Sequence, residues 1–423
     1  MRYLLFEDEL TDDLSPLTLL RPSFELVCGR DCLRRRVERW FPGAHWGVWV
    51  RSHLVAVYRE QFPDAHVNQL NWLQHHSTLL MNGRWLPDAR IDPSQLDLDS
   101  AGFIDGHLAW IALAPEELSL LTEQDFSSTL LLLARSRRVV EAGGSIIRYP
   151  WDLVSRNSTQ LVRDFRDEGL SQSTSSPQVV ILGDPQDVYI SESARIDPFV
   201  VIDATSGPVS IDRDAEVQAF TRIDGPCHIG RGARVYRAMI RGGTTVGAYC
   251  RVGGEIEESI LHSYVNKYHE GFLGHSYVCP WVNLGAMTST SDLKSDYSCV
   301  RVPLKGKSID SQMMKVGSFI GDHTKTAIDS MFNTGSSIGI MAMVLPGGRL
   351  LPRHIPSFCN ISFGELAADW PLENSLASAA IAMQRRDQTL TAAMETLIRT
   401  VYLQTEAERD AAMERARQRR SVM

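Results

Sequence analysis

The second half of the chain repeats an aliphatic residue at every sixth position, and this period restricts the fold more than any other feature. The repeats run through Ile190, Ile196, Ile202; Ile211, Val217, Ile223, Ile229, Val235; Ile240, Val246, Val252; and Ile320, Thr326, Phe332, Ile338, Val344, Leu350. A period of six is neither that of a helix nor that of a simple strand. It suits a triangular coil of short parallel strands, in which each flat side takes one hexapeptide and the aliphatic residue points inward.

Glycine follows several of the repeated residues, as in Ile229-Gly230, Val246-Gly247 and Ile320-Gly321. Glycine fits tight corners between flat sides, because it adopts positive φ without a steric penalty. The alternative is an antiparallel sandwich, whose strands would show a period of two with turns every 8–12 residues or so. The period of six favours a left-handed parallel β-helix over residues 188–360.

The period of six breaks twice, around residues 254–277 and 287–313. The second break is polar, beginning Met287-Thr288-Ser289-Thr290-Ser291-Asp292. It is too long for a corner, so we expect it to leave the coil as a loop. Long ordered loops on a rigid scaffold usually carry function.

The first half of the chain alternates between strand-like and helical patterns. The expected strands are Tyr3–Phe6, Trp46–Val50, Thr78–Met81, His107–Leu113 and Ser145–Arg148, and the expected helices are Asp31–Phe41, Ser52–Phe62 and Glu123–Glu141. Such alternation predicts an α/β domain with a mainly parallel sheet, of Rossmann-like type.

A chain of 423 residues is too long for one compact core. We expect an α/β domain over residues 1–169, a Ser- and Pro-containing linker over 170–187, the β-helix over 188–360, and a helical C-terminal extension over 361–423. In the extension, Leu390, Met394, Leu397 and Val401 share the spacing of one helix face.

Composition excludes several classes of protein. The net charge of −8 gives no electrostatic footprint for nucleic acid. No apolar stretch is long enough to span a bilayer, so no membrane partner is expected. The apolar N-terminus meets Glu7 and Asp8 after a few residues, which is typical of a first strand and not of a signal peptide. The seven cysteines form no CxxC pair, which suits a reducing cytoplasm and not a disulfide framework or zinc site.

Two stretches in the second half resemble a known family. They are Asn266-Lys267-Tyr268-His269-Glu270-Gly271-Phe272-Leu273-Gly274 and Trp281-Val282-Asn283-Leu284-Gly285-Ala286. They are similar to the hexapeptide-repeat acyltransferases, whose pattern has a His, three residues, Leu-Gly, and then Val-Asn-Ile-Gly-Ala-Gly-Thr. With the α/β domain in front, the chain resembles the sugar nucleotidyltransferases related to the bifunctional N-acetylglucosamine-1-phosphate uridyltransferase/glucosamine-1-phosphate acetyltransferase.

The resemblance implies a catalytic site on the β-helix. His269 falls on the family's catalytic base, and a neutral imidazole near pH 7 suits the removal of a proton from an attacking amine or hydroxyl. Asn283, Asp292, Lys294 and Lys267 are the implied substrate-binding residues. Two alternatives stay open: His269 as a histidine hydrogen-bonded at the edge of a rung, and Asn283 as part of a structural amide ladder. The chain departs from the family at Met287, Asp292 and Phe272, where the family has Gly, Asn and Tyr.

The stretch from Ser15 to Pro22 resembles the nucleotidyltransferase signature, but the preceding residues 7–13 are acidic and lack the family's glycines. By this resemblance Arg21 would bind phosphate, and Asn82 stands where the family has a Mg²⁺-binding Asp. Asp152 is the remaining candidate metal ligand, and its alternative role is the N-cap of the helix that follows.

These observations predict a cytoplasmic transferase that modifies sugar phosphates. It would take acetyl-CoA or another acyl-CoA on the β-helix, and a nucleoside triphosphate with Mg²⁺ at a degenerate N-terminal site. The expected ligand is a small sugar phosphate or nucleotide sugar, and the expected assembly is a homotrimer. The alternative is a non-catalytic sugar-nucleotide-binding protein that regulates or scaffolds a pathway.

Overall fold

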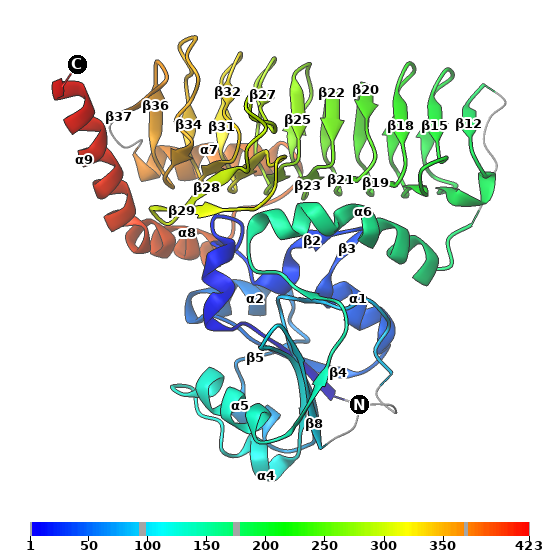
Figure 1. Cartoon of the computed structure of the whole chain (residues 1–423), viewed down its shortest axis with the longest axis vertical. Helices are drawn as coiled ribbons and strands as arrows, with labels where there is room; N and C mark the ends of the chain where they lie inside the picture. The colour runs from blue at the N-terminus through cyan, green and yellow to red at the C-terminus, as the bar shows by residue number, and fades with distance from the viewer. Residues whose placement is uncertain (1, 93–98, 172–177, 368–370, 423) are drawn as a thin grey trace. The chain divides into compact units, whose positions relative to one another are not determined.

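The computed structural model describes residues 2–92, 99–171, 178–367 and 371–422 (Figure 1). The chain forms two compact units, and each unit consists of three separate stretches of sequence. The first unit comprises Met1–Leu14, Leu20–Leu26 and Asp31–Tyr149, and the second comprises Ser15–Leu19, Val27–Arg30 and Pro150–Met423. The predicted linker falls in part on residues 172–177, which lie outside the described residues. The predicted domain boundaries at residues 169, 187 and 360 stay predictions.

The first unit is built on a seven-stranded sheet. In spatial order its strands are β10 (Arg138–Glu141), β8 (Ser100–Ile104), β9 (His107–Leu113), β6 (Thr78–Asn82), β1 (Arg2–Phe6), β4 (His45–Trp49) and β5 (His66–Val67). Only β9 runs antiparallel to its neighbours, so the sheet is mainly parallel, as predicted. Strand β6 is buried along its whole length, which explains why it reads Leu-Leu-Met and does not alternate.

Short helices connect the strands of this sheet. They are α1 (Leu33–Trp40), α2 (Val55–Gln61), α3 (Leu70–Leu73), α4 (Pro115–Leu118) and α5 (Phe126–Arg135). A two-stranded antiparallel pair, β7 (Trp85–Leu86) and β11 (Ser145–Ile146), completes the unit. The helix predicted over Glu123–Glu141 was too long, because its last residues form the edge strand β10. Val139 and Val140, being β-branched, suit that strand. Strand β8 was not predicted.

The second unit contains a parallel β-helix with three faces, as predicted. Face A consists of β13 (Val188–Ile190), β16 (Val209–Ile211), β19 (Cys227–Ile229), β21 (Thr244–Val246), β23 (Ile260–Leu261), β26 (Tyr277–Val278), β30 (Ser318–Ile320), β33 (Ser336–Ile338) and β35 (His354–Ile355). Each of its strands pairs in parallel with the equivalent strand of the next rung.

Face B carries the residues that matter most for the candidate site. It consists of β14 (Arg195–Ile196), β17 (Glu216–Val217), the starts of β20 (Arg234–Ile240) and β22 (Arg251–Glu257), β24 (Asn266–Lys267), β31 (Lys325–Thr326), β34 (Met343–Val344) and β36 (Asn360–Ser362). Asn283 continues this face between β24 and β31 by bridging to Asn266 and Lys325. The outward residue of each rung therefore lies above its equivalent in the next rung.

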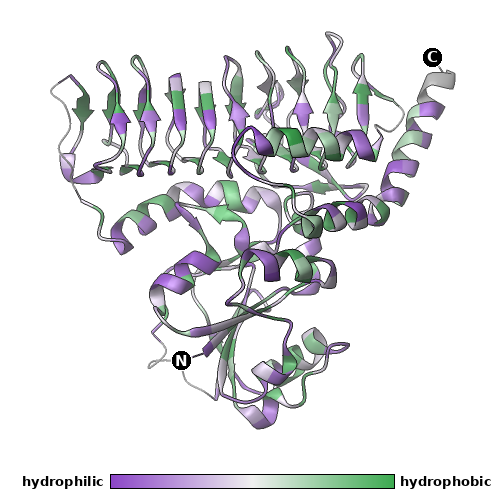
Figure 2. Ribbon diagram, turned by 180° about the vertical axis from the view of Figure 1, so that it is seen from behind, coloured by the Kyte–Doolittle hydropathy of each residue, from purple (hydrophilic) through white to green (hydrophobic). Residues whose placement is uncertain are grey.

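Face C completes the triangle. It consists of β12 (Val180–Leu182), β15 (Val201–Asp203), β18 (Arg222–Asp224), the ends of β20 and β22, β25 (Phe272–Gly274), β27 (Ser289–Thr290) and β32 (Met331–Phe332). Figure 2 shows apolar and polar residues alternating along the strands of the coil. The inward aliphatic residues are buried and form one continuous core.

The two breaks in the sequence period have different structural origins. Around residues 254–277 the coil continues without interruption, because Ile256, Leu261, Leu273 and Val278 still point inward at slightly shorter spacing. At one inward position in this region the residue is Lys267, which pairs with Val252. The second break does leave the coil, as predicted, after β27. It contains an antiparallel hairpin of β28 (Arg301–Leu304) and β29 (Lys307–Asp310).

Helices cover two faces of the coil. Helix α6 (Pro150–Asp167) lies along face A, and Figure 1 shows it beneath the strands of that face. Helices α7 (Leu372–Gln384), α8 (Ala392–Gln404) and α9 (Glu406–Val422) follow the coil. Lys325 of face B donates a hydrogen bond to Ser378 of α7, and Tyr402 of α8 packs against Phe358 with ring centroids 5.0 Å apart. Strand β37 (Glu365–Ala367) pairs with β36 and contacts α9.

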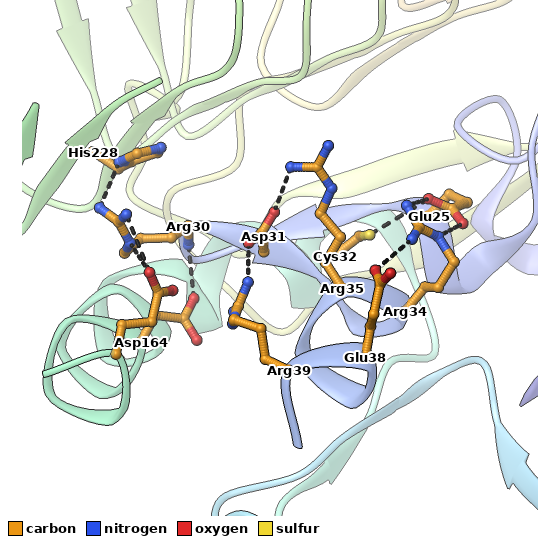
Figure 3. A network of polar contacts seen from close by, with 11 residues as sticks. Glu25, Arg30, Asp31, Cys32, Arg34, Arg35, Glu38, Arg39, Asp164 and His228 are labelled. Carbon is orange, nitrogen blue, oxygen red and sulfur yellow. Dashed lines mark hydrogen bonds and ion pairs between the residues drawn. The ribbon is translucent and has the colours of Figure 1, made fainter. Parts of the chain in front are cut away.

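The short segment Val27–Arg30 is held in the second unit by buried polar contacts. Asn157 of α6 accepts a hydrogen bond from the Gly29 N–H at 2.6 Å and donates one to the Gly243 carbonyl at 2.8 Å. Asp164 accepts from the Arg30 N–H at 2.7 Å, and the Arg30 guanidinium reaches Nδ1 of His228 at 3.0 Å (Figure 3). These contacts fix the register of α6 on face A.

Among the described residues, no helix is both long enough and apolar enough to cross a membrane.

Candidate functional site

His269 lies at the corner where β24 of face B turns into β25 of face C. Its side chain is exposed, and its ring contacts that of Tyr268 edge-on, with centroids 4.8 Å apart. Tyr268 in turn packs on Tyr236, two rungs earlier and across Gly253 of the rung between, with centroids 4.1 Å apart. Within the described part of the chain the imidazole has no hydrogen-bond partner. The ring is therefore held by packing on one side and is free to meet a substrate on the other.

Lys267 points into the coil at the same corner. It is 2% exposed, and its ammonium donates to the carbonyls of Gly253 at 2.8 Å and His269 at 3.0 Å. Burial lowers the pKa of Lys267 to about 8, and the nearby Glu270 only partly opposes this effect. Its predicted contact with substrate stays a prediction. The structure shows it bracing the turn that presents His269.

Asn283 lies on the outside of face B. Its side-chain oxygen accepts a hydrogen bond from the amide of Asn266, so the amide ladder considered from the sequence is present. Both residues also line a groove of about 760 Å³ between face B and α7. The two roles considered for Asn283 are thus compatible in this geometry.

Asp292 and Lys294 lie away from His269. Asp292 follows β27 at the far edge of face C, where its carboxylate is 2.7 Å from Nδ1 of His275. The other ring nitrogen of His275 is 3.1 Å from Glu258. Lys294 pairs within the loop with Asp296 at 3.6 Å and with Ser298. The predicted substrate-binding roles of both residues stay predictions, and the structure does not bring them to the corner of His269.

The carboxylate–imidazole–carboxylate arrangement around His275 is strongly coupled. Burial acts to lower the pKa of His275, but the hydrogen bonds to Asp292 and Glu258 outweigh it and raise the pKa to about 9. Burial acts to raise the pKa of Asp292, yet His275 keeps it below its ordinary value. His275 is therefore a cation at neutral pH that ties the long loop to the coil.

In the first unit, Asn82 ends β6 and is 1% exposed. Its amide nitrogen donates to Asp8 at 2.8 Å and to the Leu108 carbonyl at 2.9 Å, and its oxygen accepts from the Arg84 N–H at 2.9 Å. The Arg84 guanidinium forms a fork onto Asp8, at 2.7 and 2.5 Å. Both amide hydrogens of Asn82 are thus bonded within the protein.

Glu7, the first residue of the acidic stretch, is also engaged. It is 5% exposed and accepts hydrogen bonds from the Ser23 N–H at 3.0 Å and from the Arg51 guanidinium at 3.2 Å. Arg51 also donates to the carbonyl of Arg21 at 3.1 Å. Arginines therefore neutralise the two carboxylates that would lie beside a triphosphate. The phosphate contact predicted for Arg21 stays a prediction.

Asp152 lies in the first turn of α6, and its carbonyl accepts a hydrogen bond from the Ser155 hydroxyl at 3.1 Å. Among the residues that the structure describes, no group of three or more His, Cys, Asp or Glu side chains could hold a metal ion. The Asp8, Asn82 and Glu7 side chains are committed to arginines or to backbone. The role of Asp152 as a metal ligand stays a prediction.

Reasoning from the sequence missed the cations of the groove on face B. Arg251 and Lys325 occupy the outward position directly before the inward residues Val252 and Thr326. That adjacency was visible in the repeat itself. Arg385 and Arg386, in the turn after α7, could not be assigned to this groove without the packing of the C-terminal helices.

Comparisons with known proteins agree with the architecture. The family model described as sugar nucleotidyl transferase matches residues 3–169. A bifunctional sugar-1-phosphate nucleotidylyltransferase/acetyltransferase of Sulfurisphaera tokodaii is 35% identical over 144 residues, which are 33% of this chain and 36% of the relative. The bifunctional protein GlmU of Methanococcus maripaludis is 34% identical over 90 residues, 21% of this chain and 22% of the relative. The resemblance stated from the sequence is confirmed.

The chain spans about a third or less of the length of these curated relatives. Among solved structures, a UDP-N-acetylglucosamine acyltransferase matches 53% of this chain and 87% of its own length, at 12% identity and a TM-score of 0.21. A TM-score this low supports no argument. The assignment of the β-helix rests on the strand ladders described above.

Proposed function

We propose, from the membership of residues 3–169 in the sugar nucleotidyl transferase family and from the site on the coil, that this chain is a transferase acting on sugar phosphates. The β-helix would transfer an acetyl or other acyl group from acyl-CoA. The observation that carries the proposal is the exposed imidazole of His269, on a corner braced by Lys267 and within one rung of Asn283. The name of the Sulfurisphaera relative, which includes an acetyltransferase, supports it.

In this reaction the acyl-CoA supplies the activated thioester. His269 would take the proton from the attacking amine or hydroxyl of the sugar phosphate, as a general base positioned at the surface. The Lys267 ammonium would hold the turn in place through the His269 carbonyl. The free amide nitrogen of Asn283 would orient the polar acceptor on face B.

For the N-terminal domain we propose binding of a sugar 1-phosphate or nucleotide sugar with little or no nucleotidyl transfer. This is supported by the closed network of Asp8, Asn82 and Arg84 and by the pairing of Glu7 with Arg51. A Mg²⁺–triphosphate complex would have to break these buried contacts. The relatives' names support the alternative, an active nucleotidyltransferase.

The deciding experiment measures acyl transfer. Purified protein would be incubated with acetyl-CoA and a panel of amino-sugar and hexose phosphates, and release of the CoA thiol would be followed. We expect turnover by the wild type and a loss of about 100-fold or more in His269→Ala, the range of a missing general base. The control is His262→Ala, a histidine of the preceding corner of the same coil. Equal turnover by His269→Ala and wild type would refute the role of the imidazole.

The same protein preparation tests the second candidate function, that of a non-catalytic binding protein. Release of pyrophosphate from UTP with Mg²⁺ and a sugar 1-phosphate would show that the N-terminal network opens. Binding of nucleotide sugar without either activity would favour regulation or scaffolding. We further propose a cytoplasmic homotrimer, which sedimentation equilibrium tests directly, with a mass of three chains expected.

A further inference from the structure

The groove between face B and α7 has a one-sided charge. Its basic side chains are Arg251 and Lys325 from the coil and Arg385 and Arg386 from the turn that follows α7. No aspartate or glutamate is among the described residues that line it. Other outward arginines of the coil have acidic partners, as Arg234 has Glu216 at 3.4 Å and Arg222 has Asp203 at 2.6 Å. The groove is therefore a local exception to the charge balance of this surface.

Two of these cations are at least partly buried and form no ion pair with a carboxylate among the described residues. The Nε atom of Arg251 is buried and has no hydrogen-bond partner within the described residues. Lys325 donates to the neutral hydroxyl of Ser378, and burial lowers its pKa. An uncompensated buried charge or donor destabilises a folded protein, so its presence here calls for an explanation.

The cations also repel one another. Burial and then the charge of Arg251 lower the pKa of Arg386, whose guanidinium bonds only the Tyr249 carbonyl, at 3.3 Å, among the residues that the structure describes. Arg385 is exposed in the same turn, which follows α7. Two arginines at the end of α7 thus face the cations of face B across a groove of about 760 Å³. A multiply charged anion between them would relieve the repulsion from both sides.

The groove also offers neutral recognition groups. The amide nitrogen of Asn283 has no partner among the described residues, since its oxygen is the atom bonded to Asn266. Tyr264 and Trp281, which line the groove, belong to a stack of rings along the corner between faces A and B, with centroids 4.2 Å apart and planes 11° apart. Flat apolar surface beside cations suits a phosphate attached to an organic group.

We propose that this groove binds a phosphate-bearing small molecule, clamped between the outward side chains of face B and helix α7. Guanidinium groups recognise phosphate oxygens through paired, charge-assisted hydrogen bonds. Arg251 and Lys325 hold the anion from the coil, Arg385 and Arg386 hold it from the turn that follows α7, and Asn283 donates to an ester or hydroxyl oxygen. The proposal rests on the groove alone and requires neither the imidazole of His269 nor any acyl transfer.

Isothermal titration of the full chain with inorganic pyrophosphate, at fixed ionic strength, tests the site. We expect saturable binding that Arg251→Gln/Lys325→Gln weakens by about 100-fold or more, because the double variant loses two charge-assisted hydrogen bonds. The matched control is Arg234→Gln, one rung away on the same face and outside the groove, which should change affinity by less than about twofold. Undiminished binding by the double variant, or no binding of pyrophosphate, would overturn the proposal.

Two further measurements distinguish a loss of binding from a loss of folding. Arg385→Gln changes an exposed residue of the turn after α7 and cannot disturb the core, so weaker pyrophosphate binding by this folded variant supports the clamp even if the double variant fails to fold. The ligand-free Arg251→Gln protein should melt at the same temperature as wild type or higher, since it loses an unpaired buried donor. A lower melting temperature would mark Arg251 as a structural residue and count against the site.

The source of the phosphate is resolved by two more titrations. CoA binding that competes with pyrophosphate would identify the groove with the phosphates of the acyl donor, and competition by a hexose 1-phosphate would identify it with the acceptor. His269→Ala should bind pyrophosphate as wild type does. Failure of acyl transfer therefore leaves this proposal standing, and loss of pyrophosphate binding leaves the role of His269 standing.

Discussion

At the scale of single residues, His275 links stability to pH. It is held between Asp292 at 2.7 Å and Glu258 at 3.1 Å, and its pKa is raised to about 9. In the unfolded chain a histidine titrates near pH 6.5. The folded state therefore keeps the proton over a range of pH in which the unfolded state has lost it.

We predict that His275→Gln destabilises the protein by on the order of 2 kcal/mol at pH 6. Because the pKa is raised on folding, the contribution is fully present below pH 6.5 and disappears as the pH rises to about 9. Urea denaturation of wild type and variant at several pH values measures the difference. A difference that stays constant between pH 6 and pH 9 would contradict the assignment.

Lys267 should show the opposite dependence. Its pKa is lowered to about 8 by burial inside the coil, against about 10.5 in the unfolded chain. Between these values the unfolded state binds more protons, so wild-type stability should rise with pH. Relative to Lys267→Met, wild type should gain on the order of 2 kcal/mol between pH 8 and pH 10.5. The exposed Lys307→Met serves as the control and should show no such gain in the same denaturation series.

The chemical identity of the candidate residues could be predicted from the sequence, but their grouping could not. His269 and Asn283 follow one another on adjacent rungs, and the regular coil places them near one edge. Asp292 stands close behind in the sequence, yet it crosses face C and binds His275. The position of Asp292 beside His275 depends on the register of β25 against β27. That register in turn depends on where the long loop leaves the coil.

At the scale of elements, the close stacking of the rungs is set at glycines. A Cβ atom on Gly247 would lie 1.3 Å from the carbonyl oxygen of His262 in the next rung. Backbone cannot give way there, because the Gly247 N–H bonds the Leu261 carbonyl at 2.8 Å. The six-residue period therefore tolerates no side chain at this corner.

We predict that Gly247→Ala costs about 3 kcal/mol or more, as overpacking against backbone does. Gly306→Ala is the comparison, because that glycine has φ of +74° and no atom within 4 Å of the added Cβ. It should cost only the strain of its conformation, roughly 1 kcal/mol. Thermal denaturation ranks the two variants. Equal losses of stability in the two variants would show that the close contact between rungs does not determine the cost of Gly247→Ala.

The coil could be predicted because one chemical rule, an aliphatic residue inside each short strand, repeats along it. The region around residues 254–277 looked like a break because Lys267 takes an inward position and the corners shorten. A lysine can do so when its ammonium reaches two carbonyls at the corner, which no local pattern reveals. In the α/β unit, strand β10 was predicted as the end of a helix because α5 ends only just before it.

At the scale of the whole molecule, Asn157 joins three distant parts of the chain. It is fully buried and bonds the Gly29 N–H, the Gly243 carbonyl and the Thr245 hydroxyl. We predict that Asn157→Ala loses about 3 kcal/mol, because it leaves buried backbone groups unsatisfied. Thr159→Ala, exposed on the same helix, should change stability by less than about 0.5 kcal/mol. Chemical denaturation followed by far-ultraviolet circular dichroism distinguishes them.

The exchange of segments between the units could not be predicted from the sequence. Val27–Arg30 lies within the α/β half by position, and its composition resembles its surroundings. What assigns it to the second unit is a set of buried partners on α6 and face A, including Asp164 and His228. Such partners are recognisable only once the coil exists to carry them.

That arrangement constrains the order in which parts of the chain can fold during synthesis. The Thr245 hydroxyl donates to the Gly29 carbonyl across 216 positions of sequence, at 2.8 Å. During synthesis Gly29 therefore emerges from the ribosome long before the strand that will receive it. The growing chain must keep this segment available, at the entropic cost of closing a very long loop, until the fourth rung of the coil has been made.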